Sequence, residues 1–141
     1  MKKSLLSIVL FSIIILSGCN STNNEIIAKG KSQYWKVSIA YKLEGSMLND
    51  NGNMVYLKDN PPKKVEFKYS YPNGFPTGSS GTVEHYEENI KEFKIGGGSG
   101  SLNKGDNYEN LKEKIDEMSV LIQWETDGKV YNETVDLNAM K

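Results

Sequence analysis

The sequence predicts an all-β domain, an antiparallel β-sandwich with one short crossover helix. Several segments alternate apolar and polar residues with period two, and clusters of turn residues separate them at regular spacing. The chain has 141 residues, of which 38% are hydrophobic and 25% are charged, as in a single globular domain. Because period-two alternation sends every second side chain into a core, these observations favour half-buried strands.

The first 18 residues are expected to form a cleaved signal peptide. Lys2 and Lys3 precede an apolar run of twelve residues from Leu5 to Leu16. This run is shorter than the roughly 20 residues that a permanent membrane span requires. The layout of a positive region, an apolar run and small residues is typical of secretory signals.

The run closes with Leu16-Ser17-Gly18-Cys19, which resembles the lipobox of bacterial lipoproteins. In that family the signal peptidase recognises the leucine, the small residue and the glycine, and the cysteine becomes a lipidated N-terminus. The resemblance implies that Cys19, the sole cysteine, carries a diacylglyceryl group at the outer face of the cell membrane. Two acyl chains anchor a protein stably. The alternative is an ordinary secreted protein with a cysteine near its cleavage site by chance.

Residues 19–32 are interpreted as the lipidated N-terminus and a polar tether, and residues 33–141 as the β-sandwich domain. Asn20 to Asn24 contains nothing to bury, and the stretch from Asn20 to Ser32 spans about 20 Å as a flexible coil. Ile26 and Ile27 leave a second possibility open, an edge strand over 25–29 that shortens the tether.

The first half of the domain contains two clear strands. The inward positions of the first are Trp35, Val37, Ile39, Tyr41 and Leu43, and those of the second are Val65, Phe67, Tyr69 and Tyr71. Between them, Asn49 to Asn53 is expected to be a turn cluster, followed by a short strand over 54–58 that Pro61-Pro62 ends. The segment 72–81 is interpreted as a loop.

The middle of the domain is more ambiguous. Residues 82–86 and 90–95 are interpreted as two paired strands, although Tyr86, Ile90 and Phe93 also have helical spacing. Gly96 to Gly105 is expected to be a flexible connection. Asp106 is then expected to cap a helix of about two turns, with Glu109 completing a capping box and Leu111 and Ile115 on the buried side.

The last segment is predicted to be a β-hairpin around Asp127-Gly128, a preferred two-residue turn. This turn places Trp124 opposite Tyr131, Val120 opposite Val135 and Met118 opposite Leu137. Glu133 would then lie opposite Ile122, in an inward position. That conflict indicates either an open end of the sheet or a register offset by a bulge.

Seven or eight short strands with one short helix predict a sandwich of immunoglobulin-like type. Gly30-Lys31-Ser32, followed by Trp35, is similar to the entry into the first long strand of small lipoproteins from low-GC Gram-positive bacteria. The resemblance implies fold and location only. Removal of Lys2 and Lys3 lowers the 17 basic residues to 15, against 18 acidic ones, so nucleic acid or anionic headgroups are not expected as partners.

No set of residues indicates catalysis, a metal site or a cofactor. His85 is the only histidine and Cys19 is expected to be acylated, so no zinc or copper site can be built from nitrogen and sulfur. Calcium binding by oxygen ligands at Asn49 to Asn53 or near Asp106 remains conceivable, but neither segment has EF-hand spacing. The glycine- and serine-rich segments match neither a nucleophile elbow nor a phosphate loop.

Two segments are candidate functional sites. The loop after the second clear strand carries Tyr71 and Phe75, which are expected to bind a partner unless Tyr71 packs in the core and Phe75 plugs the end of the sandwich. The run from Glu84 to Glu92 holds four carboxylates, Glu84, Glu87, Glu88 and Glu92, that could act in glycoside chemistry but are typical of a solvated face.

The expected function is therefore a lipid-anchored extracytoplasmic binding or adaptor domain without catalytic activity. Its partner would be a protein or a component of the cell wall, and the sequence leaves its oligomeric state open. One alternative is a cell-envelope enzyme or carbohydrate-processing accessory that uses the acidic run 84–92. Another is a structural or protective surface lipoprotein.

Overall fold

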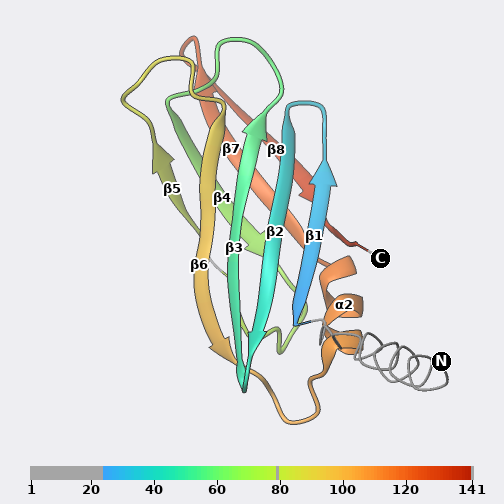
Figure 1. Cartoon of the computed structure of the whole chain (residues 1–141). Coiled ribbons are helices and arrows are strands. Elements are labelled where there is room, and N and C mark those ends of the chain that lie inside the picture. Colours follow the sequence, from blue (N-terminus) through green and yellow to red (C-terminus); the bar gives the residue numbers. More distant parts are fainter. Residues whose placement is uncertain (1–23, 79, 141) are drawn as a thin grey trace, which may run out of the picture.

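Two antiparallel β-sheets face each other in the computed structural model, which describes residues 24–78 and 80–140 (Figure 1). The front sheet has the strand order β6-β3-β2-β1-β9, and the back sheet has the order β5-β4-β7-β8. The predicted antiparallel sandwich is confirmed. The expected signal peptide, the lipobox and Cys19 lie outside the described residues.

The front sheet is built from three consecutive strands and two later ones. These are β1 (Glu25–Lys31), β2 (Trp35–Glu44), β3 (Met47–Tyr56), β6 (Glu92–Ser101) and β9 (Asn138–Ala139). Because β1 pairs along its whole length with β2, the segment around Ile26 is a strand and not a tether. The sandwich therefore begins at Glu25, ahead of the expected boundary at residue 33.

The back sheet consists of β4 (Lys64–Ser70), β5 (Ser80–Glu84), β7 (Ser119–Thr126) and β8 (Lys129–Asp136). The β7–β8 hairpin has the predicted register, with Trp124 opposite Tyr131 and Val120 opposite Val135. Glu133 lies opposite Ile122 without a bulge. Its carboxylate accepts hydrogen bonds from Ser32 Oγ at 2.6 Å and from the backbone N–H groups of residues 33 and 34 at 3.1 Å. The inward acid thus ties the β1–β2 turn to the opposite sheet.

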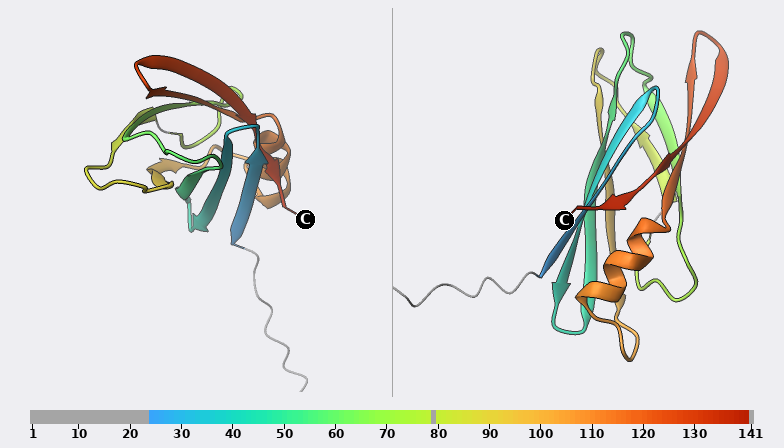
Figure 2. Two further views of the ribbon diagram at one scale, coloured as in Figure 1. Left: turned by 90° about the horizontal axis from the view of Figure 1, so that it is seen from above. Right: turned by 90° about the vertical axis from the view of Figure 1, so that its right-hand side faces the viewer.

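The core lies between the sheets and is rich in aromatic rings. Trp35 is fully buried, with its ring centroid 5.1 Å from that of Tyr56, 5.6 Å from Phe93 and 5.5 Å from Trp124. Seen from the side, the helix α2 (Tyr108–Asp116) lies at one end of the two layers (Figure 2). Leu111 and Ile115 are its buried residues, as the sequence predicts.

The predicted turn at Asn49 to Asn53 is wrong, because this segment lies within β3. β3 pairs with β2 on one side and with β6 on the other, so its backbone groups are satisfied by two neighbours. Asn49 and Asn53 donate from their side-chain amides to Glu44 and Glu92. The turn itself lies at residues 45–46, between β2 and β3.

The flexible connection predicted at Gly96 to Gly105 is also wrong over its first half, which belongs to β6. A Cβ atom at Gly100 would lie 1.6 Å from the carbonyl oxygen of Pro76, and one at Gly98 would lie 2.6 Å from Thr77 Oγ1. These glycines permit the β4–β5 loop to approach the strand closely. Their role is close packing and not flexibility.

The strands predicted around residues 87–89 exist, but their predicted pairing is wrong. β5 pairs with β4 in the back sheet, whereas β6 pairs with β3 in the front sheet. The connection between them therefore crosses from one sheet to the other. The helical alternative for residues 82–95 is not adopted.

The predicted helix cap is displaced by one residue. Asn107 is the N-cap of α2, and its side-chain oxygen accepts from the backbone N–H groups of Glu109 and Asn110. The Asn110 side chain accepts in return from the Asn107 backbone N–H, which completes a capping box. The Asp106 carboxylate instead accepts from the Asn103 backbone N–H and from Lys114 Nζ, each at 2.8 Å.

Candidate functional site

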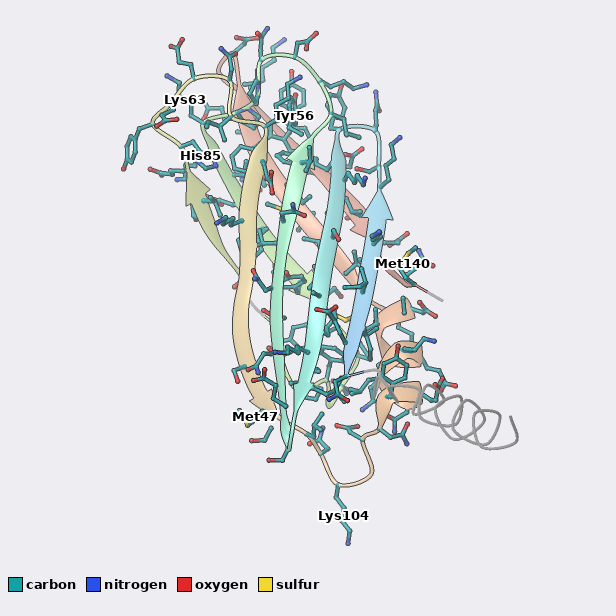
Figure 3. The ribbon with its side chains drawn as sticks, viewed as in Figure 1. Met47, Tyr56, Lys63, His85, Lys104 and Met140 are labelled. Carbon is teal, nitrogen blue, oxygen red and sulfur yellow. The ribbon has the colours of Figure 1, made fainter. Side chains whose placement is uncertain are left out.

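The sandwich has two ends that differ in character (Figure 3). The entry end carries residue 24, the β2–β3 turn, residues 71–78 and residues 102–107, and lies near the labelled Met47 and Lys104. The far end carries the β1–β2 turn, residues 57–63, residues 85–91 and the β7–β8 turn. The labelled Tyr56, Lys63 and His85 lie there.

The two predicted partner-binding aromatics, Tyr71 and Phe75, both belong to the entry end. Phe75 is only 8% exposed, and its ring packs edge-on against Tyr41 with centroids 5.5 Å apart. It therefore plugs the end of the sandwich and is not an exposed contact. Tyr71 is 46% exposed, although Gly78 packs against its ring.

A buried acid holds the loop that carries these aromatics. The Asp50 carboxylate accepts from Thr77 Oγ1 at 3.0 Å and from the Gly98 backbone N–H at 2.8 Å. Tyr41 lies opposite Asp50 in the register of β2 and β3. Burial raises the pKa of Tyr41, and the neighbouring Tyr69 and Asp50 raise it further, so its hydroxyl stays neutral. The arrangement serves to fix the loop.

The far end carries several adjoining hollows. A groove of about 500 Å³ runs between residues 60–64 and the β7–β8 hairpin, with Pro61 and Pro62 on one side and Gln123 and Val130 on the other. Two smaller hollows, of about 220 and 290 Å³, adjoin it. Lys63 borders all three, so they surround a single ridge formed by the β3–β4 loop.

Large apolar side chains are exposed around this ridge. Tyr86 is 91% exposed, Val130 is 61% exposed and Tyr131 is 39% exposed. Tyr131 is stacked on the buried Trp124, with ring centroids 5.7 Å apart and planes 17° apart. The ring of Tyr34 also packs against Trp124, with ring centroids 5.5 Å apart. Exposed rings that rest on a buried ring are held rigidly, as in many protein-binding surfaces.

Sequence reasoning missed this region because four separate connections build it. The sequence predicted only that a strand ends at Pro61-Pro62 and that a hairpin turns at Asp127-Gly128. Alternation cannot show that the two turns meet at the same end, because that depends on which strands pair. The single visible signal was the apolar Val130 at an outward position of the predicted hairpin.

The acidic run 84–92 does not converge on one point. Glu84 lies 3.9 Å from Lys64 and Glu88 lies 3.9 Å from Lys63, whereas Glu92 accepts from the amide of Asn53 in the other sheet. His85 Nε2 lies 3.0 Å from the Glu92 carbonyl oxygen, and its ring packs 4.9 Å from that of Phe93. Each of these three carboxylates therefore has its own partner on the surface, and the arrangement gives the glycoside interpretation no support.

Within residues 24–78 and 80–140, no three side chains of His, Cys, Asp or Glu are grouped as metal ligands. Over the same part of the chain, no helix has the length and apolar character of a membrane span. Comparison with known proteins finds no matching family model, no matching curated protein and no matching solved structure.

Proposed function

We propose that this chain is a lipid-anchored extracytoplasmic binding domain without catalytic activity, and that its far end contacts a protein partner. The lipobox at residues 16–19 supports the anchor. The hollowed ridge at residues 60–64, with exposed aromatic and aliphatic side chains around it, supports the contact. Of these, the ridge is the observation that carries the binding role.

The chemistry of the ridge suits a protein surface. Protein interfaces combine apolar and aromatic anchors with a polar rim, and their strongest contacts are rigid rings in hollowed surfaces. Here Val130 and Tyr86 supply the apolar contacts, while Lys63, Glu125 and Asp127 form the charged rim. The prolines of the β3–β4 loop keep its backbone rigid, which lowers the entropy lost on binding.

The orientation of the domain agrees with this role. With β1 beginning at Glu25, only residues 20–24 separate Cys19 from the sandwich, and any five residues reach at most about 18 Å. A diacylglyceryl group on Cys19 would hold the entry end close to the membrane. The far end would then be directed away from it, toward other envelope proteins.

Site-specific photo-crosslinking on intact cells tests this proposal. A photoreactive amino acid replaces Tyr86 or Val130 at the far end, and Tyr71 at the entry end as the matched exposed control. We expect one dominant adduct of defined mass from Tyr86 and Val130 and none from Tyr71. We also expect Tyr86→Ala to abolish the adduct formed from Val130, and Cys19→Ala to release the protein from the membrane.

Adducts that form equally from all three positions would contradict a far-end site. Retention of the Cys19→Ala protein in the membrane would contradict the anchor separately. Adduct formation only from Tyr71 would return the binding surface to the loop at residues 71–78.

A further inference from the structure

The outer face of the front sheet gathers lysines that have no carboxylate partner. Lys29 and Lys31 on β1, Lys36 on β2 and Lys94 on β6 all have exposed side chains that point away from the core. None of the four takes part in an ion pair within the described residues. The lysines that do so are Lys42, Lys63, Lys64, Lys91 and Lys114.

The strand register arranges these lysines around a polar centre that includes the Glu92 carboxylate. Lys29 lies opposite Ser38, Ser38 lies opposite Asn53, and Asn53 lies opposite Lys94. This row crosses four strands, so its two lysines stand about 14 Å apart at the usual strand spacing. In the next row, Lys31 lies directly opposite Lys36. Like charges in that position repel each other and destabilise the pair unless an anion lies between them.

A shallow hollow lies between the two sides of this arrangement. Its volume is about 320 Å³, and two charged residues, Glu92 and Lys94, lie on its border. The rest of its lining consists of small or amide residues: Ser38, Ala40, Asn51, Gly52 and Asn53. Glu92, the nearest carboxylate, accepts from the Asn53 amide at 2.6 Å. The hollow is open to solvent, so an extended molecule can lie across the strands.

We propose that this lysine face, defined as Lys29, Lys31, Lys36 and Lys94 around the hollow, binds a linear polyphosphate chain, without sugars or bases, laid across the strands. A single phosphate is too small to contact lysines 14 Å apart. Ammonium groups on flexible stems suit a chain of successive phosphates, which they contact as point charges. This interaction is independent of the proposed far-end contact, which uses other residues.

Other anionic partners fit the face less well. A flat anionic membrane would also meet Glu25 and Glu44, which are exposed on the same face at the entry-end termini of β1 and β2. Single-stranded nucleic acid is bound through aromatic side chains on which bases stack, and none is present on this face. The chain is acidic overall, so only the separation of charge between faces creates this positive surface.

Binding of inorganic polyphosphate to the full-length lipidated protein in neutral detergent tests the proposal. We expect saturable binding that weakens with salt, with a slope of about −3 in log affinity against log salt concentration for four lysine contacts. The triple variant Lys29→Gln, Lys31→Gln, Lys36→Gln should bind at least about tenfold more weakly, with the slope reduced to about −1. The variant should remain folded, because all three side chains are exposed.

A matched triple variant on other surfaces, Lys64→Gln, Lys68→Gln, Lys129→Gln, changes the net charge equally and should bind within about twofold of the original protein. Equal losses in both triple variants would show bulk attraction and overturn the proposal. Tighter binding to oligothymidylate of equal charge, to poly-glutamate or to vesicles containing phosphatidylglycerol would also overturn it. In each of those cases the preferred partner would be of that other class.

Discussion

At the scale of single residues, the polar groups inside the sandwich connect loops to strands. Asp50 fixes residues 71–78 through Thr77, and Glu133 fixes the β1–β2 turn. Each carboxylate lies at an inward position of its strand, where period two predicts an apolar side chain. Carboxylates withdrawn from water remain stable only where donors satisfy them. Asp50 is buried and Glu133 is partly buried, so both residues mark close contacts between separate segments.

Asp50→Ala should lower the free energy of unfolding by about 3 kcal/mol, because it leaves the Thr77 hydroxyl and the Gly98 N–H buried without an acceptor. Asp50→Asn keeps one acceptor oxygen and should cost about half as much. Urea denaturation followed by tryptophan fluorescence measures both. Wild-type stability in the alanine variant would show that the loop is held by other contacts.

Asp106 predicts a pH dependence near the start of α2. Burial opposes its charged form, but the hydrogen bonds from Lys114 and Asn103 outweigh this effect and hold the pKa of the Asp106 carboxyl below its usual value. A folded-state pKa below the unfolded one contributes stability that is present above about pH 4 and lost as the pH falls through the folded-state value. Asp106→Asn removes this contribution.

The melting temperature of Asp106→Asn should therefore be lower than that of the original chain at pH 7. The difference should shrink steadily as the pH falls below about 4. Thermal denaturation at a series of pH values measures it. A difference that stays constant down to pH 2 would show that the ionised carboxylate does not contribute.

At the scale of elements, strands with clean alternation were predictable and the polar ones were not. β2, β4 and the β7–β8 hairpin have continuous inward apolar positions, such as Trp35 to Tyr41, and they lie where the sequence predicts. The segment 49–53 and Gly96 to Ser101 carry the residues of turns. They are strands because β3 pairs on both sides and because the β4–β5 loop lies against the glycines of β6.

Gly100→Ala should destabilise the domain by about 2–3 kcal/mol, since the new methyl group would overlap the carbonyl oxygen of Pro76. Ser99→Ala, on the exposed side of the same strand, should change stability by less than about 0.5 kcal/mol. Denaturant titration compares the two. Equal effects, or rapid amide exchange across residues 96–101, would favour a flexible connection after all.

At the scale of the whole molecule, the fold separates its surfaces. The entry end carries the loop that Asp50 and Phe75 close, the far end carries the hollowed ridge, and the outer face of the front sheet carries the unpaired lysines. The net charge of the chain conceals this distribution. Two contacts with different partners could therefore be made at once without competition.

The proposed anchor predicts different access to the two ends. Lys63→Cys at the far end and Lys104→Cys at the entry end each add the only free thiol to a chain whose native cysteine is expected to be lipidated. In proteoliposomes, polyethylene-glycol maleimide should label Lys63→Cys several-fold faster than Lys104→Cys. In detergent the two rates should be similar, since the entry end no longer lies against a bilayer.

Gel shifts over time measure these labelling rates. Equal rates in proteoliposomes would contradict the orientation, even if the anchor itself were present.

The sequence by itself determined the class of the fold, the buried face of each well-patterned strand and the final hairpin. It also provided the expected lipidation signal at residues 16–19. These properties depend on neighbouring residues, which period two and turn chemistry record directly. Only the tertiary structure decided the strand assignment of residues 49–53 and 96–101, the partners of β5 and β6, and the burial of Phe75. It alone assembled the far-end ridge from separate loops and the lysine face from separate strands, because both depend on which distant strands pair.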